Sequence, residues 1–340
     1  MTINQLLQTA VKNKASDLHL VSGLPPILRI SGALIKVKAG PLTKKSVYAL
    51  GMAMLSKELQ QKFLKNKEMD VAYTLPSGER FRVNLSFEKG AITVAARAIP
   101  KKIPTMKELN LPEAAKKFTV LPHGLVLITG PTGSGKSTTL AAMINEINNT
   151  RAENIITLED PTEFGFEPNK SIIRQRQLGT DMITFAQGMK HLLRQDPNVV
   201  MVGEMRDLET ISSALTLAET GHLVFATLHT YSAAQTIDRI IDVFPPHQQP
   251  QIKMQLAMTL RGVVSQQLVP KKGGGRYAIR EILINNAAIA NLIREGKVQQ
   301  IKTVLQTSAK AGMFTLAQDI KRAISARKIE AKVAEEYLVK

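Results

Sequence analysis

Cysteine is absent from this chain of 340 residues. Its absence excludes disulfide bonds, zinc sites built on thiolates and cysteine nucleophiles. Tryptophan is also absent, and aromatic residues make up only 4% of the sequence. The chain therefore has few side chains on which the bases of a single-stranded nucleic acid could stack.

Long apolar runs are missing as well, since none approaches the ~18 residues that a membrane span requires. The first ten residues, MTINQLLQTA, show no charged segment followed by the apolar stretch of a signal peptide. We therefore expect a cytoplasmic protein with no transmembrane segment. The formal net charge of +17 would suit nucleic acid, anionic lipid or acidic proteins. Because the basic residues are scattered, with no block of five or more, we do not expect direct nucleic-acid binding.

The most specific motif of the sequence is a phosphate-binding loop that follows the pattern G-x-x-x-x-G-K-[ST]. The apolar run GLVLIT comes before it, and a helix-like stretch at 138–149 follows it. In this strand–loop–helix order, glycines let backbone N–H groups approach phosphate oxygens, and the helix N-terminus adds positive potential. Lys136 can reach the β- and γ-phosphates of a nucleotide, and the Ser137 hydroxyl can bind Mg²⁺. The expected nucleotide contacts are Gly130, Pro131, Thr132, Gly133, Ser134, Gly135, Lys136, Ser137 and Thr138.

Two acidic segments follow this loop along the chain. Glu159, Asp160 and Glu163 lie within five residues after an apolar run, and carboxylates there can hold the water around Mg²⁺ or take a proton from an attacking water. The same spacing also suits an ordinary acidic helix N-terminus. The second segment is an apolar strand, Val199 to Val202, that leads to Glu204, which we expect beside the metal ion.

Histidines and arginines complete the candidate site. His222 and His229 bracket an apolar strand and could sense the γ-phosphate through hydrogen bonds, although a structural histidine is the more usual case. An arginine could neutralise the charge of the transition state. The candidates for that role are Arg82, Arg97, Arg194, Arg206 and Arg239.

The order of the predicted elements indicates two kinds of domain. Residues 1–100 read as helices and short alternating strands, including one long helix from Thr43 to about Asn66, and predict a small α+β domain. A proline- and lysine-containing linker at 101–118 follows. Residues 119–272 alternate apolar strands with helices, which predicts a parallel sheet with helices on both faces, and 273–340 is mostly helical. The expected core strands are 125–129, 154–158, 199–203 and 223–228.

Taken together, these segments resemble the secretion ATPase superfamily, and within it the pilus retraction ATPases of the PilT type. The likeness covers almost the whole chain. The matching segments are ASDLHL at 15–20, GLPPILRISG at 23–32, RFRVN at 80–84, GPTGSGKSTTLAAM at 130–143, LEDPTEF at 158–164, VGEMRDLETI at 202–211, AETGHLVFATLHT at 218–230, TIDRIIDVFP at 236–245 and AIANLIRE at 288–295.

The resemblance implies a PAS-like N-terminal domain and a RecA-like ATPase domain in a homohexameric ring, with ATP and Mg²⁺ as cofactors. It implies that Glu204 is the acid of the Walker B strand, that Glu163 is the general base, and that Arg82 and Arg97 face the phosphates. His222 and His229 would form the histidine box. ATP hydrolysis would drive pilus retraction and twitching motility. The ring would act at the inner-membrane platform protein of the pilus base, peripheral to the membrane and without direct contact to pilin.

One departure keeps other functions open, because Ala290 stands where the retraction motif AIRNLIRE has arginine. The first alternative is a type IV secretion or conjugation-type ATPase that moves protein or DNA. The second is a regulatory module that binds nucleotide with little turnover. Pilus extension and type II secretion ATPases normally carry a longer N-terminal region and a four-cysteine zinc site, which this sequence lacks.

Overall fold

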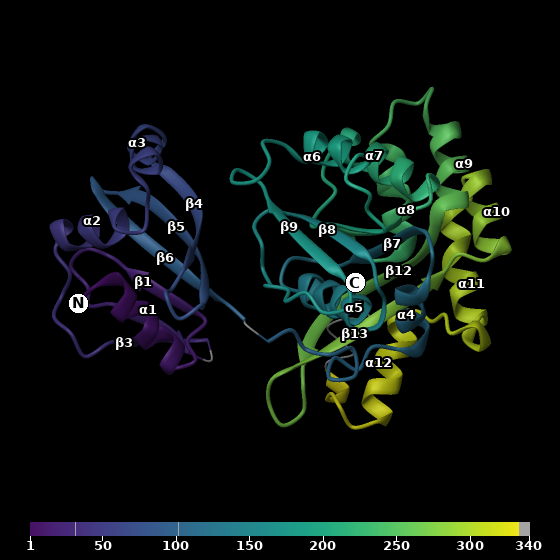
Figure 1. The fold of residues 1–340 in the computed structure, drawn as a ribbon. Coiled ribbons are helices and arrows are strands. Elements are labelled where there is room, and N and C mark those ends of the chain that lie inside the picture. Colours follow the sequence, from purple (N-terminus) through teal and green to yellow (C-terminus); the bar gives the residue numbers. More distant parts are fainter. Residues whose placement is uncertain (31, 101, 333–340) are drawn as a thin grey trace. The chain divides into compact units, whose positions relative to one another are not determined.

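A computed structural model describes residues 1–30, 32–100 and 102–332, which form two compact units (Figure 1). The first unit takes in Met1–Lys102 together with Glu163–Gly165, and the second takes in Ile103–Thr162 and the chain from Phe166 onward. The first position of the predicted linker, residue 101, and residues 333–340 of the predicted C-terminal subdomain lie outside the described residues.

The first unit is built on a six-stranded sheet in which every neighbouring pair is antiparallel. The strand order is β3-β2-β1-β6-β5-β4. Side chains alternate along the long strands, so that Phe81, Val83 and Leu85 are buried while their neighbours face the other side of the sheet. The strands are β1 (Asp17–Leu20), β2 (Ile27–Ile30), β3 (Ala33–Lys36), β4 (Glu68–Thr74), β5 (Arg80–Glu88) and β6 (Ala91–Ile99).

Three helices pack their apolar sides into the core of this unit: α1 (Ile3–Lys12), α2 (Lys44–Met52) and α3 (Lys57–Asn66). The single long helix predicted from Thr43 to Asn66 is wrong, because the chain forms α2 and α3 there. Ser56 separates them: its hydroxyl accepts the N–H of Leu59 and starts a new helix. Met54 and Leu55, in the break, are buried in the core.

The second unit contains a seven-stranded sheet in the order β13-β12-β7-β11-β10-β8-β9. All neighbours pair in parallel except β12 and β13, which form an antiparallel hairpin at one edge. The predicted parallel sheet is therefore confirmed, with one antiparallel edge strand. The strands are β7 (Gly124–Thr129), β8 (Asn154–Glu159), β9 (Ile172–Gln177), β10 (Val199–Val202), β11 (Leu223–Leu228), β12 (Leu260–Pro270) and β13 (Arg276–Ile284).

Helices cover both faces of this sheet (Figure 1). One face packs against α6 (Phe185–Leu192), α7 (Leu208–Glu219), α8 (Ala233–Asp242), α9 (Gln249–Thr259), α10 (Ala287–Glu295) and α11 (Ile301–Thr307). The other face packs against α4 (Glu113–Lys116), the short 3₁₀ helix η1 (Lys117–Val120) and α5 (Lys136–Thr150). Two more 3₁₀ turns, η2 (Val298–Gln300) and η3 (Ala309–Ala311), precede helix α12 (Leu316–Ser325), which packs on β13.

The segment predicted as a linker packs largely into the second unit. Met106, Leu111 and Phe118 are buried in the core on the α5 face. The β13 side chain of Arg280 donates hydrogen bonds to the carbonyls of Leu109 and Asn110. Within the described ranges, every helix is too short or too polar to cross a membrane.

Candidate nucleotide site

The phosphate loop connects the carboxyl end of β7 to the start of α5, as the motif predicts. Every residue of β7 is buried, which fixes the direction in which the strand delivers the loop. Gly130, Gly133 and Gly135 have φ values of 145°, 78° and 84°. These angles lie in the left-handed region, where residues with a Cβ are strained. The loop therefore has the backbone shape that lets successive N–H groups line a concave anion site.

Lys136, the first residue of α5, is buried against this loop. Its ammonium donates hydrogen bonds to the carbonyls of Gly130 at 2.8 Å and Pro131 at 3.1 Å. Nδ1 of His229 lies 3.4 Å from the same ammonium and 3.4 Å from the hydroxyl of Thr132. The lysine is thus held by its own loop and lies next to a histidine at the end of another strand.

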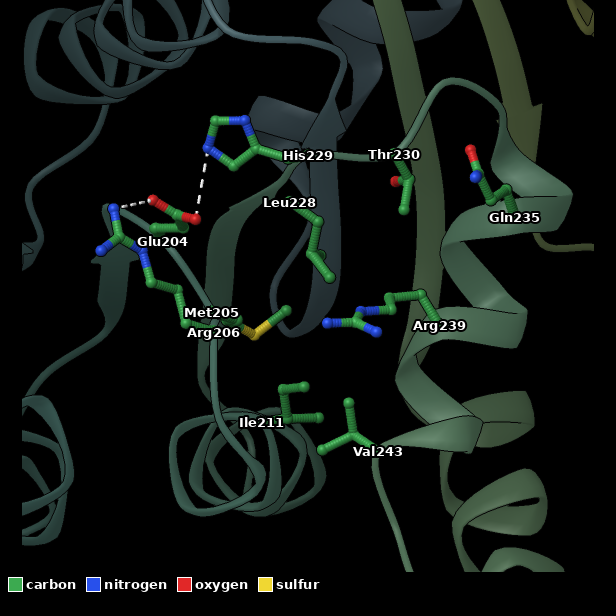
Figure 2. Close-up of a pocket in the computed structure, with 10 residues that line it drawn as sticks. All are labelled: Glu204, Met205, Arg206, Ile211, Leu228, His229, Thr230, Gln235, Arg239 and Val243. Carbon is green, nitrogen blue, oxygen red and sulfur yellow. Dashed lines mark ion pairs between the residues drawn. The ribbon is translucent and has the colours of Figure 1, made fainter.

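His229 also contacts Glu204, which extends the polar cluster away from the loop (Figure 2). Nε2 of His229 lies 3.2 Å from Oε1 of Glu204, and a nitrogen of the Arg206 guanidinium lies 2.8 Å from Oε2. Lys136, His229, Glu204 and Arg206 therefore form one continuous chain of polar contacts. It spans the carboxyl ends of β7, β11 and β10, where α/β sheets bind their ligands.

Backbone contacts hold Glu204 in place after β10 ends at Val202. The N–H of Gly203 donates to the carbonyl of Leu158 at 2.7 Å, and that of Met205 donates to Thr227 at 3.1 Å. Burial acts to raise the pKa of Glu204, but the hydrogen bonds and charges of Arg206 and His229 outweigh it, and the pKa lies below its ordinary value. The side chain of Glu204 is therefore ionised at neutral pH.

A cavity of about 370 Å³ opens on the side of Glu204 and His229 where α7 and α8 approach (Figure 2). Its walls combine apolar side chains, among them Met205 and Leu228, with polar ones, and the guanidinium of Arg239 points into it from α8. Two of the arginines proposed from the sequence, Arg206 and Arg239, thus line one cavity with the acid and the histidine. Arg194, by contrast, lies exposed just beyond the end of α6.

The acidic segment after β8 is divided between the two units. Glu159 ends β8 and is buried, and it accepts hydrogen bonds from the Thr157 hydroxyl and from the Gln175 amide. Asp160 is exposed. Glu163 has an exposed side chain and belongs to the first unit. The phosphate loop itself belongs to the second unit.

Arg82 and Arg97 also belong to the first unit, where they are direct cross-strand neighbours on β5 and β6. Nε of Arg97 donates to Asp17 at 2.8 Å, and Nε of Arg82 lies 3.9 Å from Asp70. Burial acts to raise the pKa of Asp17, but the hydrogen bonds from Arg97 and Ser16 outweigh it and the pKa is lowered. The side chain of Arg97 is 68% exposed, and that of Arg82 is 41% exposed.

His222 lies away from the other proposed site residues of the second unit. It precedes the first residue of β11, whereas His229 follows the last one. At about 3.3 Å per strand residue, the Cα atoms of the two histidines are roughly 23 Å apart along the strand. Nδ1 of His222 contacts the carbonyl of Leu217 at 3.0 Å at the end of α7. The structure thus brings His229, and not His222, to the phosphate loop.

Two observations fit a nucleotide at the loop. The hydroxyl of Ser134 is buried and has no hydrogen-bond partner among the described residues, and a Cβ at Gly133 would meet nothing within 4 Å. The loop therefore has a spare donor and an open face. Ser137 and Thr138 lie half-buried in the first turn of α5.

Sequence reasoning missed Gln266, a buried residue of β12 that hydrogen-bonds to the loop. The one available signal was the pair Gln266-Gln267 inside the apolar run that ends at Val269. A buried amide in such a run needs hydrogen-bond partners.

Comparison with known proteins identifies relatives along the whole chain. The family model described as type II/IV secretion system protein matches residues 1–335. The type IV pilus retraction ATPase PilT of Pseudomonas aeruginosa is 46% identical over 336 residues, which is 99% of this chain and 98% of that protein. A twitching motility protein of Neisseria gonorrhoeae is 43% identical over 94% of this chain and 86% of its own length. A crystal structure of the pilus retraction motor PilT with bound ADP superposes with a TM-score of 0.93 at 42% identity, covering 99% of this chain and 96% of that one.

Proposed function

This chain belongs to the type II/IV secretion system protein family, and from that premise we propose that it hydrolyses ATP to power retraction of a type IV pilus. The family expected from the sequence motifs is confirmed, and so is the α/β fold with a RecA-like sheet. The observation that carries the proposal is the continuous polar contact from Lys136 through His229 to Glu204. It joins the phosphate loop to the Walker B acid at one edge of the sheet.

The chain's own groups suit the chemistry of phosphoryl transfer to water. Such catalysis depends on positioning and on charge stabilisation more than on covalent chemistry. The N–H groups of the loop and the Lys136 ammonium would bind the phosphates, and the orphan hydroxyl of Ser134 supplies a further donor. His229 contacts both Lys136 and Glu204, so a shift of Lys136 on phosphate binding can change the position of the Walker B carboxylate.

Mg²⁺ fits the donors present. The hydroxyl of Ser137 and the carboxylate of Glu204 are the hard oxygen ligands that this ion prefers, and it usually takes its other ligands from phosphates and water. Among the described residues, no group of three or more acidic, histidine or cysteine side chains gathers as a metal cage, which agrees with such a shared site. The bound ion would neutralise charge on the phosphates.

Three residues of the first unit complete the proposal. We assign Glu163 as the general base, and Arg82 and Arg97 as the arginines that face the phosphates in the assembled ring. Both arginines lie side by side on one face of the sheet, with the side chain of Arg97 mostly exposed and that of Arg82 partly exposed, which leaves them able to contact an anion. His222 belongs to the proposal as the second residue of the histidine box, at the opposite end of β11 from the loop.

The assembly and location of the motor are part of the same proposal. We infer a homohexamer that works in the cytoplasm, peripheral to the inner membrane, against the platform protein of the pilus base. The PAS-like character of the N-terminal unit stays a prediction from the sequence resemblance.

Ala290 favours a second candidate function, a type IV secretion ATPase. It lies on α10, partly buried against the core, at the position where the retraction motif has arginine. A long cationic side chain is therefore missing from this helix. A motor with the same ATPase site but a different partner would account for that difference.

Two measurements test the proposal. We expect phosphate release per subunit to rise with protein concentration as hexamers appear in mass photometry, and Lys136→Ala to abolish it. For the retraction function, the chain is expressed in a bacterium whose own retraction ATPase is deleted, and Lys136→Ala serves as the matched control. Restored twitching with the wild type alone supports retraction. Hydrolysis without restored twitching favours the secretion ATPase, and a monomer with full turnover contradicts the ring.

A further inference from the structure

Gln266 on β12 lies directly beneath the phosphate loop, although 132 positions of sequence separate it from Ser134. Only 1% of this residue is exposed. Its side-chain nitrogen donates to the carbonyl of Ser134 at 2.8 Å, and its side-chain oxygen accepts the hydroxyl of Thr139 at 2.9 Å. One amide therefore joins the middle of the loop to the first turns of α5.

The backbone of Gln266 contacts the loop as well. A Cβ built on Gly130 would lie 2.1 Å from the carbonyl oxygen of Gln266, and one on Gly135 would lie 3.3 Å from its side-chain nitrogen. The strand thus approaches the loop at both ends as closely as glycine permits.

The contact with Ser134 has a consequence for the anion site. The peptide bond between Ser134 and Gly135 is planar and trans, so its C=O and N–H point in opposite directions. Because the carbonyl of Ser134 points at Gln266, the N–H of Gly135 points away from β12, to the concave side of the loop. Backbone N–H groups of such loops cradle the phosphates. Gln266 therefore determines the direction of one of the donors.

We propose that Gln266 is a positioning residue that clamps the Ser134–Gly135 peptide so that the phosphate loop is preformed for the diphosphate of the nucleotide. The inference rests on the proposed ATP site. When the loop is preformed, the free energy of nucleotide binding is not reduced by the cost of ordering the loop backbone. Loss of the clamp should therefore weaken nucleotide binding more than it slows the step at the γ-phosphate.

Gln266→Met tests this, since methionine has a similar length but cannot donate to Ser134. The matched control is Gln267→Met, one residue along the same strand and partly exposed. We expect the Kd of both ADP and ATP to rise roughly tenfold in Gln266→Met, with KM rising in parallel and kcat nearly unchanged. Gln267→Met should bind as the wild type does. Gln266→Glu keeps the acceptor for Thr139 and loses the donor, so it should lose at least as much affinity.

The outcomes separate this inference from the proposed function. If the wild type binds neither ADP nor ATP, the proposed function fails. If the wild type binds and Gln266→Met binds equally well, or if its loss appears only in kcat, the clamp is refuted while the ATP site stands. An equal loss in Gln267→Met would also refute it, by showing a general effect on the strand. Should Gln266→Met not fold, Gln266→Asn, whose amide is one methylene too short, is measured instead with the same expectation.

Discussion

Replacement of Glu281 on β13 tests what holds the segment between β11 and α8, which begins with His229. This carboxylate is buried and accepts the N–H of Ala233, the first residue of α8, at 2.9 Å. It also accepts the N–H of Leu316, the first residue of α12. This side chain thus adds an acceptor at the N-termini of two helices, beside their N-caps Ser232 and Thr315, and α8 begins four residues after His229.

The expected magnitude follows from these two hydrogen bonds to helix N-termini. A side-chain cap is worth roughly 1 kcal/mol, so Glu281→Ala should cost about 2 kcal/mol. A unit of this size loses about 2–4 °C of Tm for each kcal/mol, which predicts a decrease of about 4–8 °C. Glu281→Gln keeps an oxygen acceptor for the helix N–H groups, so it should lose much less.

The pH dependence separates the charge of Glu281 from its caps. Burial raises the pKa of Glu281 above its ordinary value of 4.5, although hydrogen bonds from Ala233 and Leu316 oppose this. The folded state therefore favours the protonated form, and this stabilisation is lost as pH rises from 4.5 through the raised pKa. Glu281→Gln has no such slope, so its stability relative to the wild type should improve as the pH rises.

Thermal unfolding of the wild type and both variants between about pH 5 and 8 measures this slope. The ATPase rate is recorded on the same samples, and Glu281→Ala should lower kcat because the turn that carries His229 loses its anchor. Two results would contradict this argument. The first is a Tm of Glu281→Gln as low as that of Glu281→Ala above neutral pH. The second is a Tm of Glu281→Ala equal to that of the wild type.

Three further changes have clear expected results. Gly262→Ala would place a Cβ 2.1 Å from the ring of Phe118, so the urea midpoint should fall by the equivalent of roughly 1–3 kcal/mol; an unchanged midpoint would contradict the packing. Arg97→Ala removes the partner that lowers the pKa of Asp17 and leaves the opposing effect of burial, so the variant should be less stable than the wild type above pH 3.8, and this difference should shrink as the pH falls below 3.8; a difference in unfolding free energy that does not change with pH would argue against the pair. His229→Ala should lower kcat at least roughly tenfold while ADP affinity stays within about twofold, and a parallel loss of ADP affinity would mean that His229 mainly shapes the loop.

The core of the second unit could be predicted because its strands are buried on both faces. A parallel strand in that position reads as a continuous apolar run, as in β7, β10 and β11, where every residue is buried. The phosphate-loop motif then placed the nucleotide site within this sheet, since it specifies which strand precedes the loop and which helix follows it. These signals are local in the sequence and do not depend on the strand order.

In the second unit, the strands β9 and β12 were not predicted, because their polar side chains are satisfied by distant partners. The edge strand β9 carries Arg174, Gln175, Arg176 and Gln177 and has no apolar run. The amide of Gln175 donates to Glu159 on the neighbouring strand, a contact that sequence spacing cannot show. β12 follows α9 directly, without a glycine or proline to mark the change from helix to strand.

The candidate site was predictable as a set of residue types but not as a set of contacts. Lys136 and His229 are 93 residues apart and meet because β7 and β11 are neighbours in the sheet. The spacing of His222 and His229 in one motif suggested a shared role, yet the six residues of β11 separate them. Because side-chain function depends on which end of a strand a residue occupies, two histidines of one motif can lie at opposite edges of a sheet.

The β12–β13 hairpin limits how this protein can be shortened. β13 pairs with β12 from Gly262 to Pro270, and β12 pairs on its other side with β7. A minimal ATPase that ends at residue 272, the boundary predicted from the sequence, would leave β12 as a bare edge of eleven residues. Such an unpaired edge invites pairing with other copies. A soluble catalytic fragment should therefore extend at least through Ile284, where β13 ends.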